Sequence, residues 1–321
     1  MANLLYYGDN LEVLRRHIKD ETVDLIYLDP PFKSNQDYNV LFANQDGTRS
    51  AAQIQAFEDT WRWDQGAALA YQEIVEAGGK ASQVMQAFRQ FLGENDMLAY
   101  LAMMAPRLVE LRRTLKPTGS IYLHCDPTAS HYLKMLMDAV FGPQNFRNEI
   151  IWLRTLSKSL MTRRLPQNHD VILCYQKSNQ VTWNLEATFI SYDQDNLDEK
   201  TTSKYSHRDP DGRLYQLDNL TNPNPDRPNL TYEFLGVKKV WRWTKERMEA
   251  AYKAGLVVQP SPGAVPRLKR YLDEQRGRSL GDVWTDIPPI NSQAAERLGY
   301  PTQKPEALLE RIIKASSNEG D

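Results

Sequence analysis

Long hydrophobic runs are missing from this sequence of 321 residues. No apolar stretch approaches the ~20 residues that a membrane-spanning helix needs, and the amino terminus lacks a basic segment followed by an apolar one. The sequence therefore predicts neither a membrane protein nor a secreted one, and we expect it in the cytoplasm. Hydrophobic residues make up 41% of the chain and charged residues 25%, as in ordinary globular proteins with a large core.

Cysteine is scarce as well. Cys125 and Cys174 lie in apolar, strand-like runs, without further Cys or His at the spacing of a zinc site. We interpret both as core residues in a reducing compartment, where a disulfide framework is not expected. His124 and Asp126 resemble a metal-ligand pair, but one His and one Asp favour a strand end that faces a pocket. The prediction is no metal.

An excess of positive charge is also absent. The 39 Lys and Arg residues are balanced by 41 Asp and Glu residues, so the formal net charge is -2. A simple nucleic-acid binder normally shows a basic domain, because it neutralises phosphates. Any contact with nucleic acid must therefore come from local basic patches.

The sequence does contain a short segment that joins a buried strand to a stiff polar turn. Residues 23–28 form an apolar run typical of a strand buried on both faces of a parallel sheet. Asp29 follows, and Pro30 and Pro31 fix the backbone of the turn. Since ligands of open α/β sheets bind beyond the carboxyl ends of strands, we expect Asp29, the Pro30 carbonyl and Phe32 at a pocket. The alternative is a strand-ending turn with an exposed Asp.

Helices and strands alternate along much of the chain, which predicts an α/β fold with a mostly parallel sheet covered on both faces. The expected strands are residues 4–7, 23–28, 120–125, 149–152 and 170–175, and the expected helices are 11–19, 67–77, 81–92, 95–115 and 129–140. Residues 43–93 lack strand signals and are interpreted as a helical insertion. Between 182 and 285, helical periodicity largely disappears and turn residues increase, which indicates a small β-rich module.

The tetrapeptide Asp29-Pro30-Pro31-Phe32 resembles the catalytic motif of DNA amino-methyltransferases, which move a methyl group from S-adenosylmethionine to an exocyclic base nitrogen. Residues 119–126, 141–146 and 300–305 resemble other segments of the permuted, beta-type members, particularly type III modification subunits and solitary enzymes. The resemblance implies a Rossmann-like methyltransferase sheet with helices on both faces. It also implies that a β-rich target-recognition insertion interrupts this sheet.

The resemblance implies three segments. Residues 1–181 would form the catalytic domain with its helical insertion at 43–93, residues 182–285 the target-recognition domain, and residues 286–321 a return to the catalytic domain. Double-stranded DNA is the implied substrate, and the expected location is the bacterial nucleoid. A homodimer and a restriction subunit stay open as further partners.

The implied catalytic residues are Asp29, Pro30, Pro31 and Phe32. The amino nitrogen of adenine is a poor nucleophile because its lone pair is delocalised into the ring. The Asp29 carboxylate and the Pro30 carbonyl would bind the amino hydrogens, while Phe32 stacks on the extruded base. Neither cysteine follows a proline, so a covalent cytosine-C5 mechanism is not expected. Asp at the first position favours adenine N6 in the resemblance, and cytosine N4 is the closest alternative.

The implied cofactor is S-adenosyl-L-methionine. The resemblance implies these cofactor-site residues: Asp9, Asn10, Asp29, Thr302, Gln303, Lys304 and Pro305. The last four precede a predicted helix, whose free backbone donors would suit the methionine carboxylate. The structural alternatives are a helix N-cap at Asp9 and a proline-started helix at Pro305.

Clusters of basic residues with interleaved aromatic residues predict DNA contacts, since cations meet phosphates and flat rings meet bases. The predicted DNA-binding residues are Lys33, Asn35, Tyr38, Lys158, Arg163, Arg164, Lys238, Lys239, Arg242, Arg267, Lys269 and Arg270. For any single one of them, a solvated charged surface is the alternative.

One segment of the family has no counterpart. Its members carry a glycine-rich segment that cradles the methionine of the cofactor, and in the permuted order it follows the helix after Pro305. This sequence ends at Asp321 and contains no Gly-x-Gly. We therefore expect the last strands of the sheet to be missing, with an unpaired edge in mid-sheet. The hypothesis is an amino-terminal portion of a longer methyltransferase, and the alternative is a DNA-binding module without activity.

Overall fold

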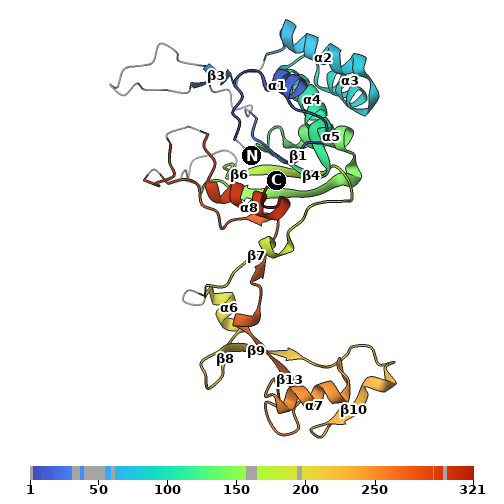
Figure 1. Ribbon diagram of the computed structural model, residues 1–321, viewed down its shortest axis with the longest axis vertical. Helices are drawn as coiled ribbons and strands as arrows, with labels where there is room; N and C mark the ends of the chain where they lie inside the picture. The colour runs from blue at the N-terminus through green and yellow to red at the C-terminus, as the bar shows by residue number, and fades with distance from the viewer. Residues whose placement is uncertain are drawn as a thin grey trace. The chain divides into compact units, whose positions relative to one another are not determined.

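The computed structural model describes residues 3–30, 37–39, 55–58, 62–156, 165–193, 197–291, 293–298 and 302–321. The chain divides into two compact units (Figure 1). The main unit comprises Met1–Thr188 and Gly281–Asp321, and the inserted unit comprises Phe189–Leu280. The sequence predicts the insertion at 182–285.

Within the described residues, the main unit is built on a five-stranded sheet with the strand order β1-β4-β6-β5-β15. Its strands are β1 (Val23–Leu28), β4 (Leu115–Cys125), β6 (His169–Gln176), β5 (Phe146–Leu153) and β15 (Val283–Trp284). β4 and β6 are buried along most of their length, which explains their unbroken apolar runs. The predicted α/β fold class is confirmed.

The sheet is mixed rather than mostly parallel. β1 pairs with β4, and β15 with β5, in parallel, whereas β6 runs antiparallel to both β4 and β5. The prediction of a mostly parallel sheet rested on the alternation of helices with apolar, strand-like runs, and burial on both faces produces such a run in a strand of either direction. Because β1 and β4 are parallel, their carboxyl ends lie at the same rim of the sheet, where Asp29 and Asp126 follow them.

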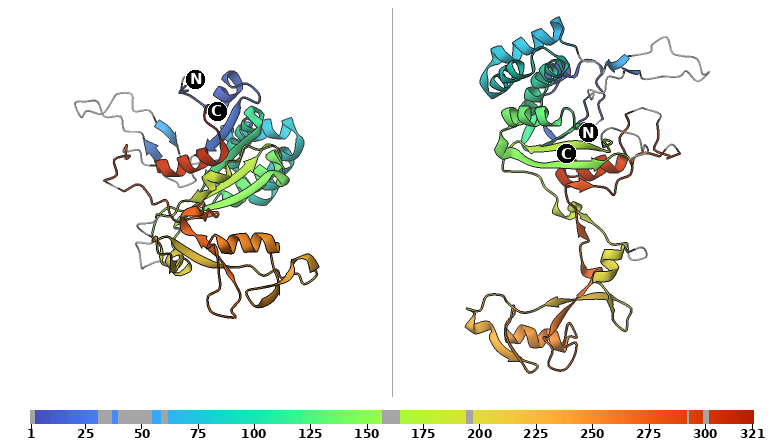
Figure 2. Two further views of the ribbon diagram at one scale, coloured as in Figure 1. Left: turned by 60° about the horizontal axis from the view of Figure 1, so that its bottom comes forward. Right: turned by 180° about the vertical axis from the view of Figure 1, so that it is seen from behind.

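Helices cover both faces of this sheet (Figures 1 and 2). α4 (Asp96–Thr114) and α5 (Ser130–Phe141) cover one face, and α8 (Glu306–Ser316) covers the other. Successive side chains of β4 point to opposite faces. Leu123 belongs to the main hydrophobic core with α4 and α5, whereas the Tyr122 hydroxyl lies 2.6 Å from the Ser316 hydroxyl of α8.

Two further helices, α2 (Gln65–Ala77) and α3 (Gly79–Leu92), pack beside α4. Polar side chains fix where helices begin: Asp64 accepts the Ala67 N–H at 2.9 Å, and Asn95 accepts the Leu98 N–H at 3.0 Å. The helices predicted at 67–77, 81–92, 95–115 and 129–140 are confirmed, with boundaries that differ by a few residues.

The strand predicted at residues 4–7 does not form. These residues have no regular secondary structure, and Leu5 and Tyr7 are 99% and 80% exposed. An apolar run becomes a strand only where its backbone groups find a neighbouring strand, and in the described part of the sheet β1 pairs only with β4. The next predicted element forms as α1 (Asn10–His17).

A short antiparallel pair joins β2 (Asp37–Asn39) and β3 (Gln55–Glu58), in a region where the sequence predicts a polar loop and then helices. Strands of three and four residues are too short to show an alternation of apolar and polar side chains, which explains the wrong prediction.

The inserted unit holds an antiparallel sheet in the order β12-β13-β9-β8 and a separate β10-β11 hairpin. Its elements are β7 (Phe189–Ile190), α6 (Glu199–Lys204), β8 (His207–Arg208), β9 (Leu214–Asn219), β10 (Thr231–Phe234), β11 (Val237–Val240), α7 (Lys245–Lys253), β12 (Val257–Val258), β13 (Arg267–Tyr271) and β14 (Arg278–Ser279). Strands dominate, as predicted. The sequence did not predict α6 and α7, although the N-caps Asp198 and Thr244 were available as a signal.

Short 3-10 turns at Pro143–Asn145, Leu185–Thr188, Pro228–Leu230 and Leu272–Glu274 complete the described secondary structure. Among the described helices, none combines the length and the apolar character that a membrane span requires.

Replacing Leu123 by Ala should lower the free energy of unfolding by roughly 2–5 kcal/mol, because the side chain is fully buried in β4 and its loss leaves a cavity. Chemical denaturation followed by tryptophan fluorescence measures the change. Leu69→Ala is the control, since Leu69 is 63% exposed on α2, and it should change the free energy by less than roughly 0.5 kcal/mol. Equal losses in the two variants would contradict this description of the core.

Candidate active site

Asp29 and Lys304 meet at the rim of the sheet, although they lie 275 residues apart in the sequence. Asp29 directly follows β1, and Lys304 lies in the turn ahead of α8. The Lys304 ammonium donates to Oδ1 of Asp29 at 2.9 Å, to Oδ2 at 2.7 Å and to the Thr302 carbonyl at 3.3 Å. The Lys304 side chain is 11% exposed and that of Asp29 is 30% exposed. A predicted catalytic residue and a predicted cofactor-site residue are therefore in direct contact.

Gln303 stabilises the turn ahead of α8 through two side-chain hydrogen bonds. Its Oε1 accepts the Leu298 N–H at 2.9 Å, and its Nε2 donates to the Glu296 carbonyl at 2.6 Å. Pro305 is buried and is the N-cap residue directly ahead of α8, which agrees with the structural alternative of a proline-started helix, and its cofactor role stays a prediction. The turn that carries Lys304 is thus held from both sides.

The first backbone donor of α8 binds a carboxylate of the chain itself. The Glu306 N–H donates to Oε2 of Glu296 at 2.9 Å. The N-terminus of a helix has unpaired N–H groups and a partial positive charge, so a carboxylate is the kind of ligand that it favours. The donor predicted for the methionine carboxylate is present, and Glu296 uses it.

Four polar side chains form a chain beneath the rim, from β1 across β4 and β6 to the end of β5. The Tyr27 hydroxyl lies 2.6 Å from Nδ1 of His124, and Nε2 of His124 lies 3.0 Å from Oδ2 of Asp170. Arg154 completes the chain, with its Nε 2.9 Å from Oδ1 of Asp170. The side chains of His124 and Asp170 are 0% and 1% exposed. We call these four residues the buried polar chain, although the Arg154 side chain is 48% exposed and reaches the chain from the surface.

The partners fix the direction of these hydrogen bonds. As a carboxylate, Asp170 can only accept, so the Arg154 guanidinium and Nε2 of His124 both donate to it. A neutral imidazole satisfies both contacts when its Nε2–H donates to Asp170 and the Tyr27 hydroxyl donates to Nδ1. Burial, together with the charges of Asp29 and Asp170, raises the pKa of Tyr27 above its usual range, so the hydroxyl keeps the proton that it donates.

The prediction that His124 and Asp126 face a pocket is wrong for His124. Its ring lies on the same face of β4 as Tyr122 and packs edge-on against Trp152, at 5.8 Å between ring centroids. Asp126 has a local role, because its Oδ1 accepts the Ala129 N–H at 3.1 Å at the start of α5.

Both cysteines are buried, as predicted. Burial raises the pKa of the Cys174 thiol to about 12 and that of Cys125 well above its ordinary value. Since the thiolate is the nucleophilic form, neither side chain is suited to covalent catalysis at neutral pH. In the part of the chain that the structure describes, no group of three or more His, Cys, Asp or Glu side chains could hold a metal ion.

Asp9 and Asn10 lie at the start of α1, where they bind Arg107 of α4. Asp9 caps the helix, with its Oδ1 2.8 Å from the Leu11 nitrogen, so the N-cap alternative is confirmed. Arg107 Nη2 donates to both carboxylate oxygens of Asp9, at 2.8 and 3.0 Å, and its Nε donates to Oδ1 of Asn10 at 2.7 Å. A cofactor role for Asp9 and Asn10 stays a prediction.

Several predicted site residues lie outside the described residues. These are Pro31, Phe32, Lys33, Asn35, Lys158, Arg163 and Arg164, and for Tyr38 only the backbone is described, in β2. Pro30 is described and lies half-buried next to Asp29.

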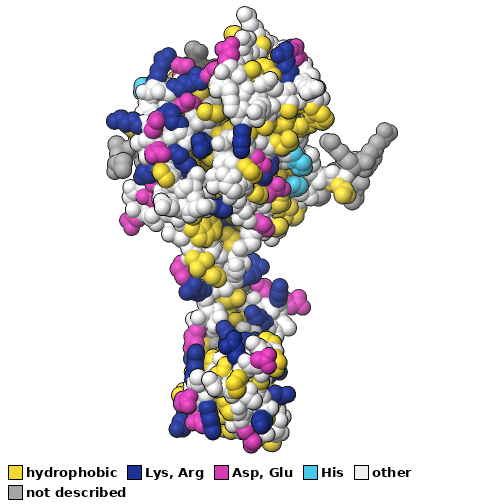
Figure 3. All heavy atoms as spheres, turned by 90° about the vertical axis from the view of Figure 1, so that its right-hand side faces the viewer, with side chains coloured by type: hydrophobic (Ala, Val, Ile, Leu, Met, Phe, Trp, Pro, Cys, Tyr) yellow, Lys and Arg dark blue, Asp and Glu magenta, His cyan; other side chains and the backbone are white. Residues whose placement is uncertain are grey.

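The predicted DNA-binding residues of the inserted unit divide into two groups. Lys269 pairs with Asp209 and Arg270 with Asp218, each at 2.6 Å between nitrogen and oxygen. Among the described residues, the other group forms no ion pair: Lys238, Lys239, Arg242 and Arg267. On the face shown in Figure 3, Lys and Arg side chains are mixed with Asp and Glu side chains, in keeping with the balanced composition.

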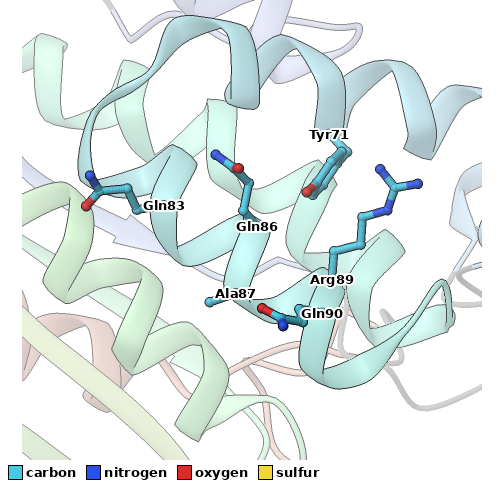
Figure 4. A pocket seen from close by; sticks show the side chains of 6 residues that line it. All are labelled: Tyr71, Gln83, Gln86, Ala87, Arg89 and Gln90. Carbon is cyan, nitrogen blue, oxygen red and sulfur yellow. The ribbon is translucent and has the colours of Figure 1, made fainter.

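A shallow depression of about 580 Å³ lies on α2 and α3 (Figure 4). It is lined by Tyr71, Gln83, Gln86, Ala87, Arg89 and Gln90. The Arg89 guanidinium extends beside the Tyr71 ring, 5.1 Å from its centroid. Because none of these residues belongs to the predicted site, we do not count this depression as part of it.

The site therefore contains the Asp29 carboxylate at the rim of the sheet, the Lys304 ammonium bound to it, and the buried polar chain below the rim. Tyr27 and Asp29 are two residues apart, so their side chains project from the same face of the β1 backbone. Sequence reasoning missed Tyr27, Asp170 and Arg154 as partners, because contacts across several strands leave no local pattern. Polar residues inside otherwise apolar strands, such as His124 and Asp170, were the available signal.

A family model described as DNA methylase matches residues 23–321. The Mod subunit of the type III restriction-modification enzyme StyLTI, from Salmonella typhimurium, is 25% identical over 327 aligned positions that cover 97% of this chain. The type II methyltransferase M.EcaI, from Enterobacter cloacae, is 26% identical over 326 positions that cover all of it. The chain spans only 46% of the first relative and 61% of the second.

Solved structures are similar at lower identity. TTHA0409 from Thermus thermophilus, whose crystal structure is a complex with S-adenosyl-L-methionine, aligns with 97% of this chain and 72% of its own. The identity is 12% and the TM-score is 0.36.

Replacing Tyr27 by Phe should lower the free energy of unfolding by roughly 1–3 kcal/mol, because it removes a hydrogen bond to a buried imidazole and keeps the ring. Chemical denaturation measures the loss. Tyr7→Phe is the matched control, since Tyr7 is 80% exposed, and its stability should equal that of the unchanged protein. A stability of Tyr27→Phe indistinguishable from that control would show that the contact with His124 contributes nothing.

Proposed function

Because the chain belongs to the DNA methylase family, we propose that it transfers a methyl group from S-adenosylmethionine to the N6 amino group of an adenine extruded from double-stranded DNA. The family match over residues 23–321 supports the reaction class. The observation that carries the residue assignment is the contact between Asp29 and Lys304, which joins the two segments expected to bind base and cofactor.

In this proposal Asp29 is a hydrogen-bond acceptor for the amino group of the base. A carboxylate offers about four lone-pair positions, and Lys304 uses one on each oxygen, so positions remain for an amino hydrogen. The Pro30 carbonyl, in the stiff turn that follows, would accept the second hydrogen. Two fixed acceptors then favour a pyramidal nitrogen whose lone pair is available, and they stabilise the positive charge that develops on it.

Lys304 would act as a positioning residue for this carboxylate. Its ammonium contacts both oxygens of Asp29, so it restricts rotation of the carboxylate and fixes the direction of the remaining lone pairs. Gln303 and buried Pro305 hold the turn in which Lys304 lies. The buried polar chain holds the other side of the contact, at the end of β1. Preorganisation of this kind avoids reorganisation at the moment of reaction.

The chain's own residues fit one end of S-adenosylmethionine. The Glu306 N–H at the start of α8 binds a carboxylate, that of Glu296, which is the chemistry expected for the methionine carboxylate. The Glu306 N–H would hold that end of the cofactor once the cofactor displaces Glu296 from it. When bound, S-adenosylmethionine supplies an electrophilic methyl group on a sulfonium.

The family covers both N6 and N4 methylation, so family membership does not identify the base that is methylated. The Asp at the first position of the tetrapeptide favours adenine N6 by resemblance. Nucleoside analysis of methylated DNA by mass spectrometry separates N6-methyladenine from N4-methylcytosine. One relative is the Mod subunit of a restriction-modification enzyme. This relationship supports a restriction subunit as a further partner of the chain.

Asp29→Asn should reduce the turnover number for methyl transfer roughly 100-fold or more, by analogy with the loss of one preorganised partner in an oxyanion hole. Transfer of a labelled methyl group to mixed-sequence duplex DNA measures turnover, and a DNA-binding assay should show an unchanged Kd. Asp20→Asn is the control, because Asp20 is a largely exposed partner of Arg113, and its turnover should stay normal. Near-normal turnover of Asp29→Asn would refute the assignment.

Lys304→Gln should lower kcat by roughly 10- to 100-fold with little change in the Kd for DNA, since a small displacement of a catalytic group costs this much. Lys304→Arg should recover part of the rate, because it restores a cation that can donate to both oxygens of Asp29. The kcat and KM values of the three proteins test this. A rise in KM for DNA at constant kcat would show that Lys304 binds substrate instead of positioning Asp29.

A further inference from the structure

A groove of about 420 Å³ lies in the inserted unit, where β9, β11 and β13 meet the segment that follows β9. Val240 and Val265 contribute apolar surface to it, and Lys239 and Arg267 bring positive charge from separate strands. Arg267 is directly opposite Asn219 in the pairing of β13 with β9. The nine described residues that line the groove include no carboxylate.

The amide side chains at the groove present donors. Oδ1 of Asn219 accepts the Thr221 N–H at 3.1 Å and the Thr221 hydroxyl at 2.9 Å. Oδ1 of Asn222 accepts the Asn224 N–H at 3.0 Å. The oxygen of Asn219 has both of its acceptor positions filled and that of Asn222 has one filled, whereas both NH2 groups are left for a ligand.

The cations at the groove differ from the basic residues beside them. Lys269 is bound to Asp209, and this hydrogen bond lowers the pKa of the Asp209 carboxyl below its ordinary value. Lys239 and Arg267 have no such partner in the described chain. Arg242 adds a third cation, and its Nε donates to the Thr221 carbonyl at 3.1 Å, next to the groove. The groove therefore combines uncompensated positive charge with amide donors.

We propose that this groove binds the phosphodiester backbone of DNA and does not read bases. A phosphate offers only acceptors and a negative charge, which match Lys239, Arg267 and the two amide NH2 groups. The amino groups on the edges of adenine and cytosine would find the amide oxygen of Asn219 fully used and that of Asn222 bound once. The proposal rests on the proposed function in one respect, which is that the partner is DNA. It separates Lys239 and Arg267, as phosphate contacts, from Lys269 and Arg270, as structural ion pairs.

The test measures the affinity of the full chain for labelled mixed-sequence duplex DNA at a series of salt concentrations. Each phosphate contact contributes about 0.9 to the slope of log affinity against log salt concentration. Lys239→Gln and Arg267→Gln should each reduce the slope by about that amount, and Arg267→Lys should keep it. Lys253→Gln is the control, because it removes the same charge from an exposed site on α7 of the same unit, and it should leave the slope unchanged.

Two results would overturn the proposal. One is an unchanged slope in Lys239→Gln, whose exposed side chain can be replaced without disturbing the fold even if Arg267→Gln fails to fold. The other is a loss of affinity confined to particular duplex sequences, since guanine edges also present acceptors and would be read by base contacts. A reduced slope in a protein that transfers no methyl group would refute the proposed function and leave the groove assignment intact. Normal methyl transfer with an unchanged slope would support the proposed function and refute the groove assignment.

Discussion

A single ion pair, between Lys304 and Asp29, joins the end of β1 to the turn ahead of α8. The pairing of β1 with β4 sets the position of Asp29, and the packing of α8 on the sheet sets the position of Lys304. The contact therefore depends on the whole main unit, because Asp29 and Lys304 are within hydrogen-bonding distance only when β1 and α8 both occupy their places on the sheet. Partial burial strengthens the contact, because water screens the charges less than at an open surface.

The buried polar chain has a different role from that ion pair. Burying a His and an Asp inside a sheet is costly because both must be desolvated, and hydrophobic residues of similar size would often be equally stable. What the buried polar chain adds is a set of hydrogen bonds with fixed directions. Each of its members has a defined hydrogen-bond partner, which favours the observed register of β1, β4 and β6 over other registers. The register matters most at the end of β1, because a slip by one residue would turn Asp29 to the opposite face.

Much of the main unit could be predicted from local patterns. The apolar run before Asp29 indicated β1, and Asn95 indicated where α4 begins. What failed depends on distant partners. The direction of β6 was missed because burial, not direction, determines its apolar run, and residues 4–7 lack a neighbouring strand despite their apolar character. Arg107 binds Asn10 from 97 residues away, and composition could not separate Lys239 from Lys269, since only the fold places a carboxylate next to one of them.

The Glu296 carboxylate at the start of α8 has a consequence for any ligand that ends in the same group. Glu296 is attached ten residues before the N–H that it binds, so it is a tethered competitor of any other carboxylate for that N–H. An incoming carboxylate has to outcompete it, and its apparent affinity falls by the corresponding factor. The same tether closes the helix end again once the ligand departs, which favours rapid exchange over long residence.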